Sequence, residues 1–328
     1  MQLPRRSLLQ LAVCTAALPA VSRLARAQPF PSHPIRLVIP FPPGGVYDST
    51  GRPWAEKVKP HLGTIVVENI GGAGSSLGTA AVARAQPDGY TILLGGFGGL
   101  VVNPIASSHS QYDPLKDFEP IALLGTNPSL IDVHPSQPFR TLKELIDFAK
   151  LNPGKLSYAS PGTGSGNHLV GELLKSLTGT QITHVPYRGA GPALTDLIGG
   201  HVPMLVQSVT GQAIEMHNTG RMRILAVTSR KRLAAAATIP TTAEAGFPDL
   251  VFDNFIGLFA PKGTPMPIIE QIAQATRAAI ADQDLQRTYT NAGFNPDGES
   301  SPEETGQFLR REIDRWIPLI KAMGLKLD

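Results

Sequence analysis

Two glycine-rich turns, each set between a strand-like run and a helix-like segment, constrain the fold of this chain more than any other feature. The first is PPGG at residues 42–45, after the apolar run 35–39. The second is GTGSG at residues 162–166, after the run 156–159. Glycine lets backbone N–H groups approach a ligand, and the unsatisfied N–H groups at a helix start favour negative charge. Two such turns in separate halves predict one anionic ligand held from both sides.

Strand-like runs alternate with helix-like ones, which is typical of βαβ units on mostly parallel sheets. Strands are predicted at residues 37–40, 64–68, 91–94, 121–124, 156–159, 183–185, 204–207 and 223–227. A chain of 328 residues exceeds the usual size of a single core, which favours two domains. Turn-rich segments at 132–138 and 249–254 are the expected crossovers. We therefore predict an α/β protein with flanking helices, in which residues 28–132 plus 254–328 form one domain and residues 133–253 form the other.

Three helix starts carry the capping-box pattern, in which Ser or Thr is followed three residues later by Glu: Thr141–Glu144, Thr241–Glu244 and Ser301–Glu304. The last has proline at its first helical position, which also favours a helix start. The apolar positions 309–320 recur with helical spacing, so this final helix is expected to dock on a core. Trp316 lies on that stripe and is expected to pack rather than to bind a ligand.

The first 27 residues have the pattern of an export signal. Paired arginines at 5–6 precede an apolar run at 8–20, and Ala-Arg-Ala at 25–27 forms a small-x-small cleavage site. The pattern predicts cleavage after Ala27, a mature chain that begins at Gln28, and a periplasmic location. The paired arginines fit either the general secretory route or the twin-arginine route.

The leader makes the full chain more basic than the mature chain, and it contains the single cysteine. Removing its four arginines from the 29 Lys and Arg leaves 25, against 26 Asp and Glu, so the mature chain is near neutral. No basic stripe of the kind that follows phosphates is present, which excludes nucleic acid as a partner. Cys14 lies in the leader after the large residue Val13, which argues against lipoprotein processing. Without cysteine, the mature chain has no disulfide and no thiolate nucleophile.

Patterns for catalysis and cofactors fail on spacing. A nucleophile elbow needs Gly-x-Ser-x-Gly, but Thr163 stands two residues before Ser165. Neither glycine turn closes with Gly-Lys-Ser/Thr, and the glycines of 72–78 are spaced one residue too widely for the common dinucleotide fingerprint. The eight histidines show no metal-ligand spacing. Asp48 is expected to cap a helix rather than to act as a base. No enzyme, cofactor or metal is predicted, and an α/β hydrolase or dehydrogenase remains the alternative.

Taken together, the sequence blocks resemble the Bug-type (TctC-like) solute receptors of tripartite tricarboxylate transporters over nearly the whole mature chain. The resemblance is carried by IRLVIPFPPGGVYD, VVENIGGAGSSLGTAAVARAQPDGYTILLG, YDPLKDFEPIALL, KLSYASPGTGSGNHLVGELL, HVPYRGAGPALTDLIGG, RILAVTSRKR and GLFAPKGTP. It implies a two-domain, periplasmic-binding-protein-like fold that closes over a small carboxylate. It also implies that backbone N–H groups and ordered water in loops 42–48 and 160–168 hold the carboxylate. These loops contain no Lys or Arg, so they would meet the anion with dipoles.

The resemblance implies a ligand site made of the following residues: Phe41, Pro43, Gly44, Gly45, Tyr47, Asp48, Phe97, Ser160, Gly162, Gly164, Ser165, Asn167, His168, Gln207 and Ser208. Two positions depart from the family pattern. Gln207 stands where an acidic residue is frequent, and Phe255-Ile256 replaces the usual Trp-Phe. The far end of the ligand is therefore left open as a second carboxylate, an amide or an aromatic ring. The implied partners are the transporter's membrane subunits, with a sensor kinase as the alternative, and the receptor is expected to be a monomer.

Overall fold

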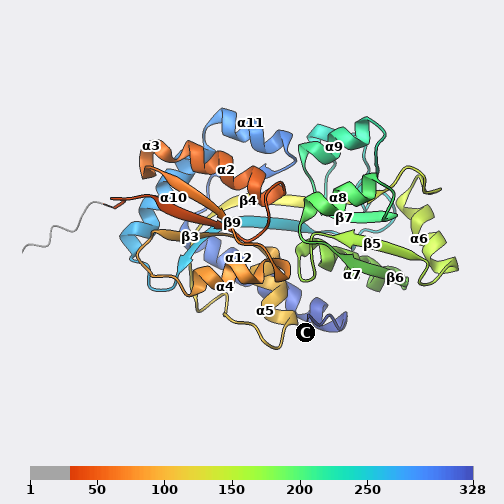
Figure 1. Cartoon of the computed structure of the whole chain (residues 1–328), viewed down its shortest axis with the longest axis horizontal. Helices are drawn as coiled ribbons and strands as arrows, with labels where there is room; N and C mark the ends of the chain where they lie inside the picture. The colour runs from red at the N-terminus through yellow and green to blue at the C-terminus, as the bar shows by residue number, and fades with distance from the viewer. Residues whose placement is uncertain (1–29, 328) are drawn as a thin grey trace, which may run out of the picture. The chain divides into compact units, whose positions relative to one another are not determined.

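The computed structural model describes residues 30–327, of which His33 onward form one compact unit. The predicted signal peptide and its cleavage site after Ala27 lie outside the described residues. Within this unit the strands form one mixed sheet in the order β2-β1-β3-β9-β4-β7-β5-β6, and β8 and β10 also pair with β4 (Figure 1). No helix in the described part of the chain is both long enough and apolar enough to span a membrane.

The strands are β1 (Ile35–Ile39), β2 (Ile65–Asn69), β3 (Thr91–Gly96), β4 (Phe118–Val133), β5 (Leu156–Ser160), β6 (Ile182–Pro186), β7 (Met204–Ser208), β8 (Arg223–Val227), β9 (Asp253–Pro261) and β10 (Asn295–Pro296). The α-helices are α2 (Val46–Lys57), α3 (Lys59–Leu62), α4 (Ser76–Ala83), α5 (Asn103–Ala106), α6 (Leu142–Leu151), α7 (Gly166–Thr178), α8 (Ala190–Ile198), α9 (Gly211–Asn218), α10 (Met266–Ile280), α11 (Gln283–Asn291) and α12 (Pro302–Ala322). Three short turns of other helix types are η1 (Ala73–Ser75), η2 (Gly98–Val102) and η3 (Ala234–Ala236).

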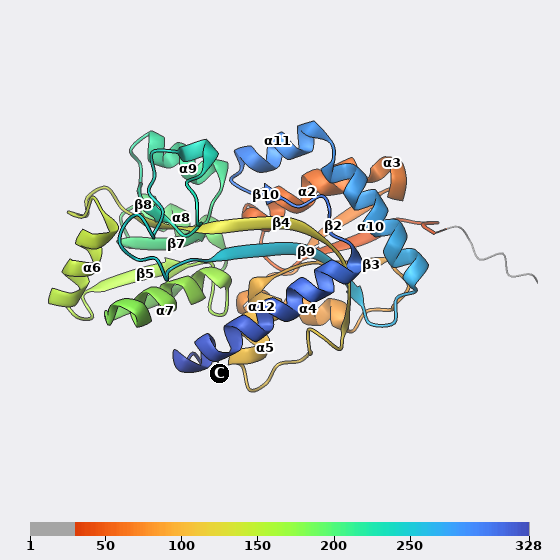
Figure 2. The same ribbon diagram turned by 180° about the vertical axis from the view of Figure 1, so that it is seen from behind.

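Every predicted strand is present, and the alternation with helices is confirmed. Parallel pairs join β1 to β2 and β3, and join β5 to β6 and β7. The sequence analysis missed β9 and most of the length of β4, which pair antiparallel with each other and with their neighbours. These two strands run along the length of the sheet, and Figure 2 shows α12 lying beside them.

Strand β4 changes partners along its length. It pairs with β9 from Phe118 to Pro128, and with β7 from Ser129 to Val133. We call the part of the sheet with β1–β3, β9 and β10, together with its helices, half A. The part with β5–β8, together with α6–α9, is half B. The partner change at Pro128/Ser129 comes four residues before the domain boundary expected from the sequence, and that boundary stays a prediction.

The core of half A contains an aromatic cluster that fixes α12 to the sheet. Trp316 of α12 is 1% exposed and packs edge-on against Phe97 and Phe252, with ring centroids 5.2 and 5.7 Å apart. The packing role expected for Trp316 is therefore confirmed. The capping box of α12 is also present: the Ser301 hydroxyl accepts from the Glu304 N–H, and the Glu304 carboxylate accepts from the Ser301 N–H.

The helix expected from Thr241 is absent, although its reciprocal capping bonds to Glu244 do form, at 2.8 and 3.1 Å. The segment makes a turn instead. Gly246 has a φ of +95°, which helices do not use, and Pro248 follows two residues later. A capping box marks a start, and the next residues decide whether a helix continues.

Candidate ligand site

The first glycine turn leads into α2 with its N-terminal donors uncapped. Gly45 is the N-cap residue of α2. Glycine has no side chain, so no N-cap side chain accepts a hydrogen bond from the first turn of this helix. The preceding residue, Gly44, has a φ of +94°, which glycine adopts without strain. The Asp48 N–H donates to the Gly45 carbonyl at 3.0 Å, whereas the first N–H groups of a helix, here those of Val46 and Tyr47, lie too early to find an acceptor within it. Anion binding by these two N–H groups stays a prediction of the sequence analysis.

A polar network fixes this loop from the neighbouring strand. The Asn69 side-chain amide, at the end of β2, donates to the Phe41 carbonyl at 2.8 Å and to the Asp48 carboxylate at 3.2 Å. Asp48 also forms an ion pair with Arg52 at 2.9 Å, and Arg52 donates to the Asn69 oxygen at 2.9 Å. Asp48 does not cap from the N-cap position. It accepts weakly, at 3.4 Å, from the Gly44 N–H. Asp48 therefore acts as a brace for the loop.

The second glycine turn is satisfied largely by its own atoms. The Ser165 hydroxyl caps α7 by accepting from the His168 N–H at 3.2 Å. The Gly164 N–H donates to His168 Nδ1 at 3.1 Å, and the Ser165 N–H donates to the Gly162 carbonyl at 3.1 Å. The Gly162 N–H in turn donates to the Ser160 hydroxyl at 3.2 Å. These donors hold the turn in shape and are not free to bind an anion.

His168 and His184 are stacked beneath this turn, with ring centroids 4.0 Å apart. Burial lowers the pKa of His168 to about 4, although the nearby Glu172 carboxylate opposes the shift. Burial, followed by the neighbouring His168, lowers the pKa of His184 to about 3. Both rings are therefore neutral at neutral pH. His168 Nδ1 acts as an acceptor for the turn, and His184 Nε2 lies 2.7 Å from the Ser160 hydroxyl.

A small cavity, which we call the inner cavity, lies between the two halves. It measures about 30 Å³ and is lined by Phe41, Pro42, Gly45, Val46, Tyr47, Pro161, Asn167, Ala190, Ser208 and Thr210. No charged side chain lines it. Since a water needs about 10–15 Å³ of such space, the cavity holds about two or three groups of that size.

Four helices begin at the inner cavity. They are α2, whose N-cap is Gly45; α7, which contains Asn167 in its first turn; α8, which begins at Ala190; and α9, whose N-cap is Thr210. The α7 and α9 starts are capped by Ser165 and Thr210. The α2 and α8 starts have no side-chain cap. A Cβ placed on Gly45 would lie 3.9 Å from the Ala190 Cβ, so the two uncapped starts face each other.

Polar side chains from both halves complete the wall of the inner cavity. The Asn167 amide donates to the Ser129 hydroxyl of β4 at 3.0 Å, which fixes its orientation. Ser208, at the end of β7, lies 3.5 Å from the Asn167 amide oxygen. Tyr47 is 6% exposed; burial raises its pKa, and a hydrogen bond with the Asn254 side chain opposes the shift. The wall thus presents neutral hydrogen-bonding groups.

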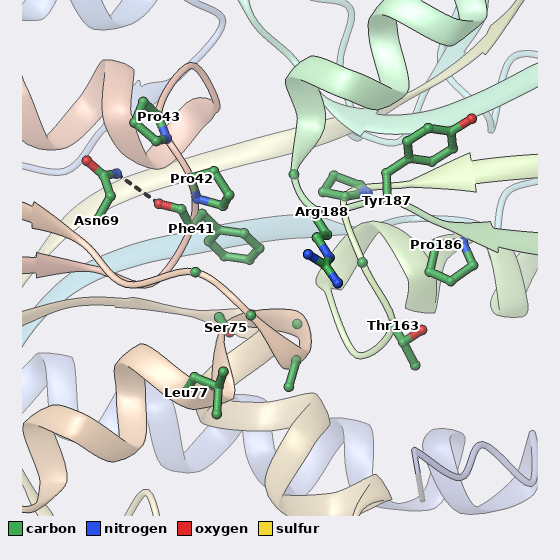
Figure 3. A pocket seen from close by; sticks show the side chains of 17 residues that line it. Phe41, Pro42, Pro43, Asn69, Ser75, Leu77, Thr163, Pro186, Tyr187 and Arg188 are labelled. Atoms are coloured by element: carbon green, nitrogen blue, oxygen red, sulfur yellow. Dashed lines mark hydrogen bonds between the residues drawn. The ribbon is translucent and has the colours of Figure 1, made fainter.

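A larger cavity, the outer cavity, adjoins the first and measures about 730 Å³ (Figure 3). It shares Phe41, Pro42 and Pro161 with the inner cavity. Its other lining residues are Pro43, Asn69, Gly71, Gly72, Ala73, Gly74, Ser75, Leu77, Gly162, Thr163, Pro186, Tyr187, Arg188 and Gly189. Figure 3 shows Arg188 extending between Phe41 and Thr163. The outer cavity is therefore also formed by both halves.

The halves touch directly beside these cavities. A Cβ on Gly74 of half A would lie 2.2 Å from the Thr163 carbonyl oxygen of half B, so no larger residue fits there. The Asn103 amide nitrogen donates to the carbonyls of Gly74, Gly98 and Gly164 at 3.1, 2.8 and 3.2 Å. Asn103 is 6% exposed and connects half A to the second glycine turn.

The structure brings together only part of the predicted site. Phe41, Gly45, Tyr47, Asn167 and Ser208 line the inner cavity, and Phe41, Pro43 and Gly162 line the outer one. The remaining predicted residues line neither of these cavities: Gly44, Asp48, Phe97, Ser160, Gly164, Ser165, His168 and Gln207. Most of these support the two turns, whereas Phe97 is fully buried in the aromatic core. The site as a whole stays a prediction.

The Gln207 side chain is buried and lines neither cavity. Its side-chain amide donates to the buried Asp132 carboxyl at 2.6 Å. Successive strand residues face opposite sides of a sheet, so Ser208 faces the inner cavity while Gln207 faces away from it. The departure from the family pattern at this position therefore bears on the core of half B.

The cavity-lining residues that the predicted site did not include comprise, among others, Asn69, Arg188, Ala190 and Thr210. A signal was present for Asn69, because it ends the strand parallel to β1, and parallel strands place their carboxyl ends at one edge. Thr210 precedes a helix-like run and could have been taken as an N-cap. The roles of Arg188 and Ala190 depend on how the halves meet, which no local pattern reveals.

Among the described residues, no group of three His, Cys, Asp or Glu is arranged to hold a metal ion.

Comparison with known sequences gives matches that span nearly the whole chain. The family model of the tripartite tricarboxylate transporter family receptor matches residues 51–325. A protein from the tcbD-tcbE intergenic region of Pseudomonas sp. (strain P51) is 38% identical, over 96% of this chain and 94% of the relative. Protein BugT of Bordetella pertussis is 33% identical over 92% of each chain.

Solved structures of the same family match this chain over nearly their whole length. The periplasmic binding protein BugD superposes with a TM-score of 0.86 at 34% identity, covering 90% of this chain and 99% of its own. Rpa4515 of R. palustris with adipate has a TM-score of 0.86 at 32% identity, with coverage of 90% and 99%. MatC of Rhodopseudomonas palustris with bound malate has a TM-score of 0.84 at 31% identity, with coverage of 89% and 100%. The fold is that of the periplasmic binding proteins, and the chain belongs to the Bug/TctC family of tripartite tricarboxylate transporter receptors.

Proposed function

We propose that this chain is a periplasmic receptor that binds a small organic carboxylate between halves A and B. The carboxylate occupies the inner cavity, and the rest of the ligand extends into the outer one. The receptor then delivers the acid to the membrane subunits of a tripartite tricarboxylate transporter. Family membership and the acids bound by two relatives, adipate and malate, support this function.

The observation that carries the proposal is the pair of uncapped helix starts, α2 and α8, on opposite walls of the inner cavity. An anion there accepts from main-chain N–H groups of both halves and lies at the positive ends of two helix dipoles. The proposal keeps the predicted binding of the anion by dipoles but takes the start of α8 as its half B side, because the N–H groups of Gly164 and Ser165 already have acceptors.

The expected strength of this grip is sufficient for a transport receptor. Hydrogen bonds to a charged group contribute about 1.5–3 kcal/mol each, and a micromolar affinity requires about 8 kcal/mol. A few N–H contacts and the burial of the ligand's apolar surface reach that value. Binding therefore needs neither a covalent step nor a buried cation at the inner cavity.

The first test is a thermal-shift screen of mono- and dicarboxylates, amino acids and aromatic acids against the mature protein. A ligand that binds only the folded state raises stability by about 2.7 kcal/mol at a hundredfold excess over its Kd. The best acid is then compared with its amide by calorimetry. Equal affinity for the neutral amide and the acid would rule out an anion grip.

A variant at the cavity wall tests its location. Gly45→Leu places a side chain against Ala190 and fills the inner cavity, so affinity for the best acid should fall more than tenfold. Gly191→Leu is the matched control, because a side chain at this α8 glycine meets nothing within 4 Å. Both variants should keep the circular dichroism spectrum of the parent. Equal affinities in the two variants would place the carboxylate elsewhere.

Delivery is tested in cells. A strain that lacks this receptor should lose uptake of the labelled acid and regain it with the parent gene, but not with Gly45→Leu. Retained uptake in the deletion strain, combined with a lost transcriptional response to the acid, would favour the sensor-kinase partner instead.

A further inference from the structure

The outer cavity is much larger than a carboxylate requires. Its volume of about 730 Å³ is in the range of cavities that hold a whole small molecule. Because it shares Phe41, Pro42 and Pro161 with the inner cavity, a ligand anchored there by one carboxylate extends its body here. The chemistry of the outer wall therefore selects among acids that share the same anchor.

That wall carries one charged side chain. Prolines, Phe41, Leu77 and glycine backbone form most of its surface, and Arg188 is the single ionised group among its lining residues. The Arg188 side chain is exposed and has no carboxylate partner among the described residues. It therefore remains free to bind a ligand.

The position of Arg188 in the chain is electrostatically unfavourable without an anion nearby. It directly precedes Gly189, the N-cap residue of α8, so its positive charge lies near the positive end of that helix dipole. The α8 start has no side-chain cap and no acidic residue in its first turn to offset this repulsion. An anionic group in the outer cavity would offset it, because it attracts both the guanidinium and the helix start.

We propose that Arg188 binds a second anionic group at the far end of the ligand, so that the receptor prefers dicarboxylates over monocarboxylates of the same length. This inference rests on the proposed function, since it takes the first carboxylate to be in the inner cavity. The planar guanidinium matches a carboxylate with two parallel N–H···O bonds. Of the three options left open by the sequence for the far end of the ligand, this assigns the second carboxylate.

The experiment compares matched acids by calorimetry on the mature protein. The dicarboxylates are succinate, glutarate, adipate and pimelate, and the partners of equal length are butyrate, pentanoate, hexanoate and heptanoate. Each is measured with the parent, Arg188→Gln and Arg188→Lys. Arg221→Gln is the control, because Arg221 is an exposed arginine of half B that lines neither cavity.

In the parent, the best dicarboxylate should bind at least tenfold more tightly than its matched monocarboxylate. Arg188→Gln should remove that difference and leave the monocarboxylate within about twofold, whereas Arg188→Lys should keep part of it. Because Arg188 is exposed, added salt should reduce the parent's preference for the dicarboxylate. Arg188→Gln has no such preference, so salt should change its two affinities about equally. Arg221→Gln should behave as the parent.

Three results would overturn the inference. If monocarboxylates bind as tightly as dicarboxylates, the outer cavity does not select a second anion. If Arg188→Gln weakens both classes equally, the arginine attracts anions in general. If it weakens neither class, the far group is held elsewhere. The proposed function survives all three, and it fails separately if no acid binds to any of these proteins.

Discussion

At the scale of single residues, most polar side chains of the two glycine turns hold the backbone in place. Asn69 and Asp48 brace the first turn, and His168 and Ser165 brace the second. The inner cavity is then lined by the uncapped starts of α2 and α8 and by neutral side chains such as Asn167 and Ser208. Substituting one of these supporting side chains should therefore lower the free energy of unfolding more than it lowers ligand affinity.

Ser165→Ala tests this division. Loss of the α7 cap should lower the free energy of unfolding by about 1 kcal/mol, measured by urea denaturation. Affinity for the best acid should change less than threefold, since the Ser165 hydroxyl accepts from the His168 N–H and lines neither cavity. Ser165→Thr retains a capping hydroxyl and is the control. A large loss of affinity with unchanged stability would instead make Ser165 a direct ligand contact.

The sequence predicted both turns but not the partners of their donors. Glycine spacing and helix starts are local, so the uncapped start at Gly45 was within reach of sequence reasoning. The engagement of the Gly164 N–H by His168 depends on a ring four residues away folding back, and Gly164 itself contacts Asn103 from a distant segment. Contacts of that kind can be predicted only when the order of the strands in the sheet is known.

At the scale of elements, β4 carries an unusual buried group. Asp132 is fully buried, one carboxyl oxygen accepts from Gln207, and the other has no partner. Burial raises the pKa of Asp132 to about 8, with the Gln207 bond opposing the shift. The carboxyl therefore stays protonated at neutral pH, in the middle of half B.

This carboxyl should make stability fall as the pH rises toward 8. Between the unfolded pKa near 4 and the folded pKa, the folded state retains a proton that the unfolded state has lost, so its stabilising effect declines with rising pH. From pH 6.5 to 8 the loss should be about 1–2 kcal/mol by urea denaturation. His168 and His184 are neutral throughout this window.

Asp132→Asn removes the titrating group and should abolish that decline. The comparison is made on the difference between parent and variant at each pH, which cancels the other titrating groups. A slope that is the same in both proteins would mean that Asp132 is already ionised in the folded state.

Element types were predictable where the apolar pattern was local. The eight expected strands are all present, and all but the run at 121–124, which lies within the longer β4, are short strands. Strand β9 was missed because residues 249–254 have turn composition, while its ladder with β3 and β4 is a long-range contact. The Thr241 helix was predicted and is absent, because Gly246 and Pro248 end it after one turn.

At the scale of the whole unit, the two halves share β4, which changes partner at Pro128/Ser129. We expect the halves to move relative to each other at this point. Opening would separate the α2 start from the α8 start and would break the Asn103 bond to Gly164. We therefore expect the position of the halves and ligand affinity to be coupled through Asn103.

Asn103→Ala should favour the open arrangement. Small-angle scattering should give a larger radius of gyration than the parent without ligand, and saturating acid should restore compaction. Affinity should fall about tenfold, because part of the binding energy is then used for closure. Asn152→Ala is the control, since its amide donates to Phe148 within half B. An unchanged radius with a lower melting temperature would show that Asn103 only stabilises the fold.

The proposed binding of the first carboxylate by main-chain N–H groups has a consequence for how such a receptor would change over generations. Backbone N–H groups persist through nearly every substitution, so the anchor for the first carboxylate survives mutation of the side chains around it. The outer cavity would have no such protection, because side chains such as Leu77, Phe41 and Arg188 form part of its wall. We therefore expect single replacements there to change which acids bind, while the preference for an acid is retained.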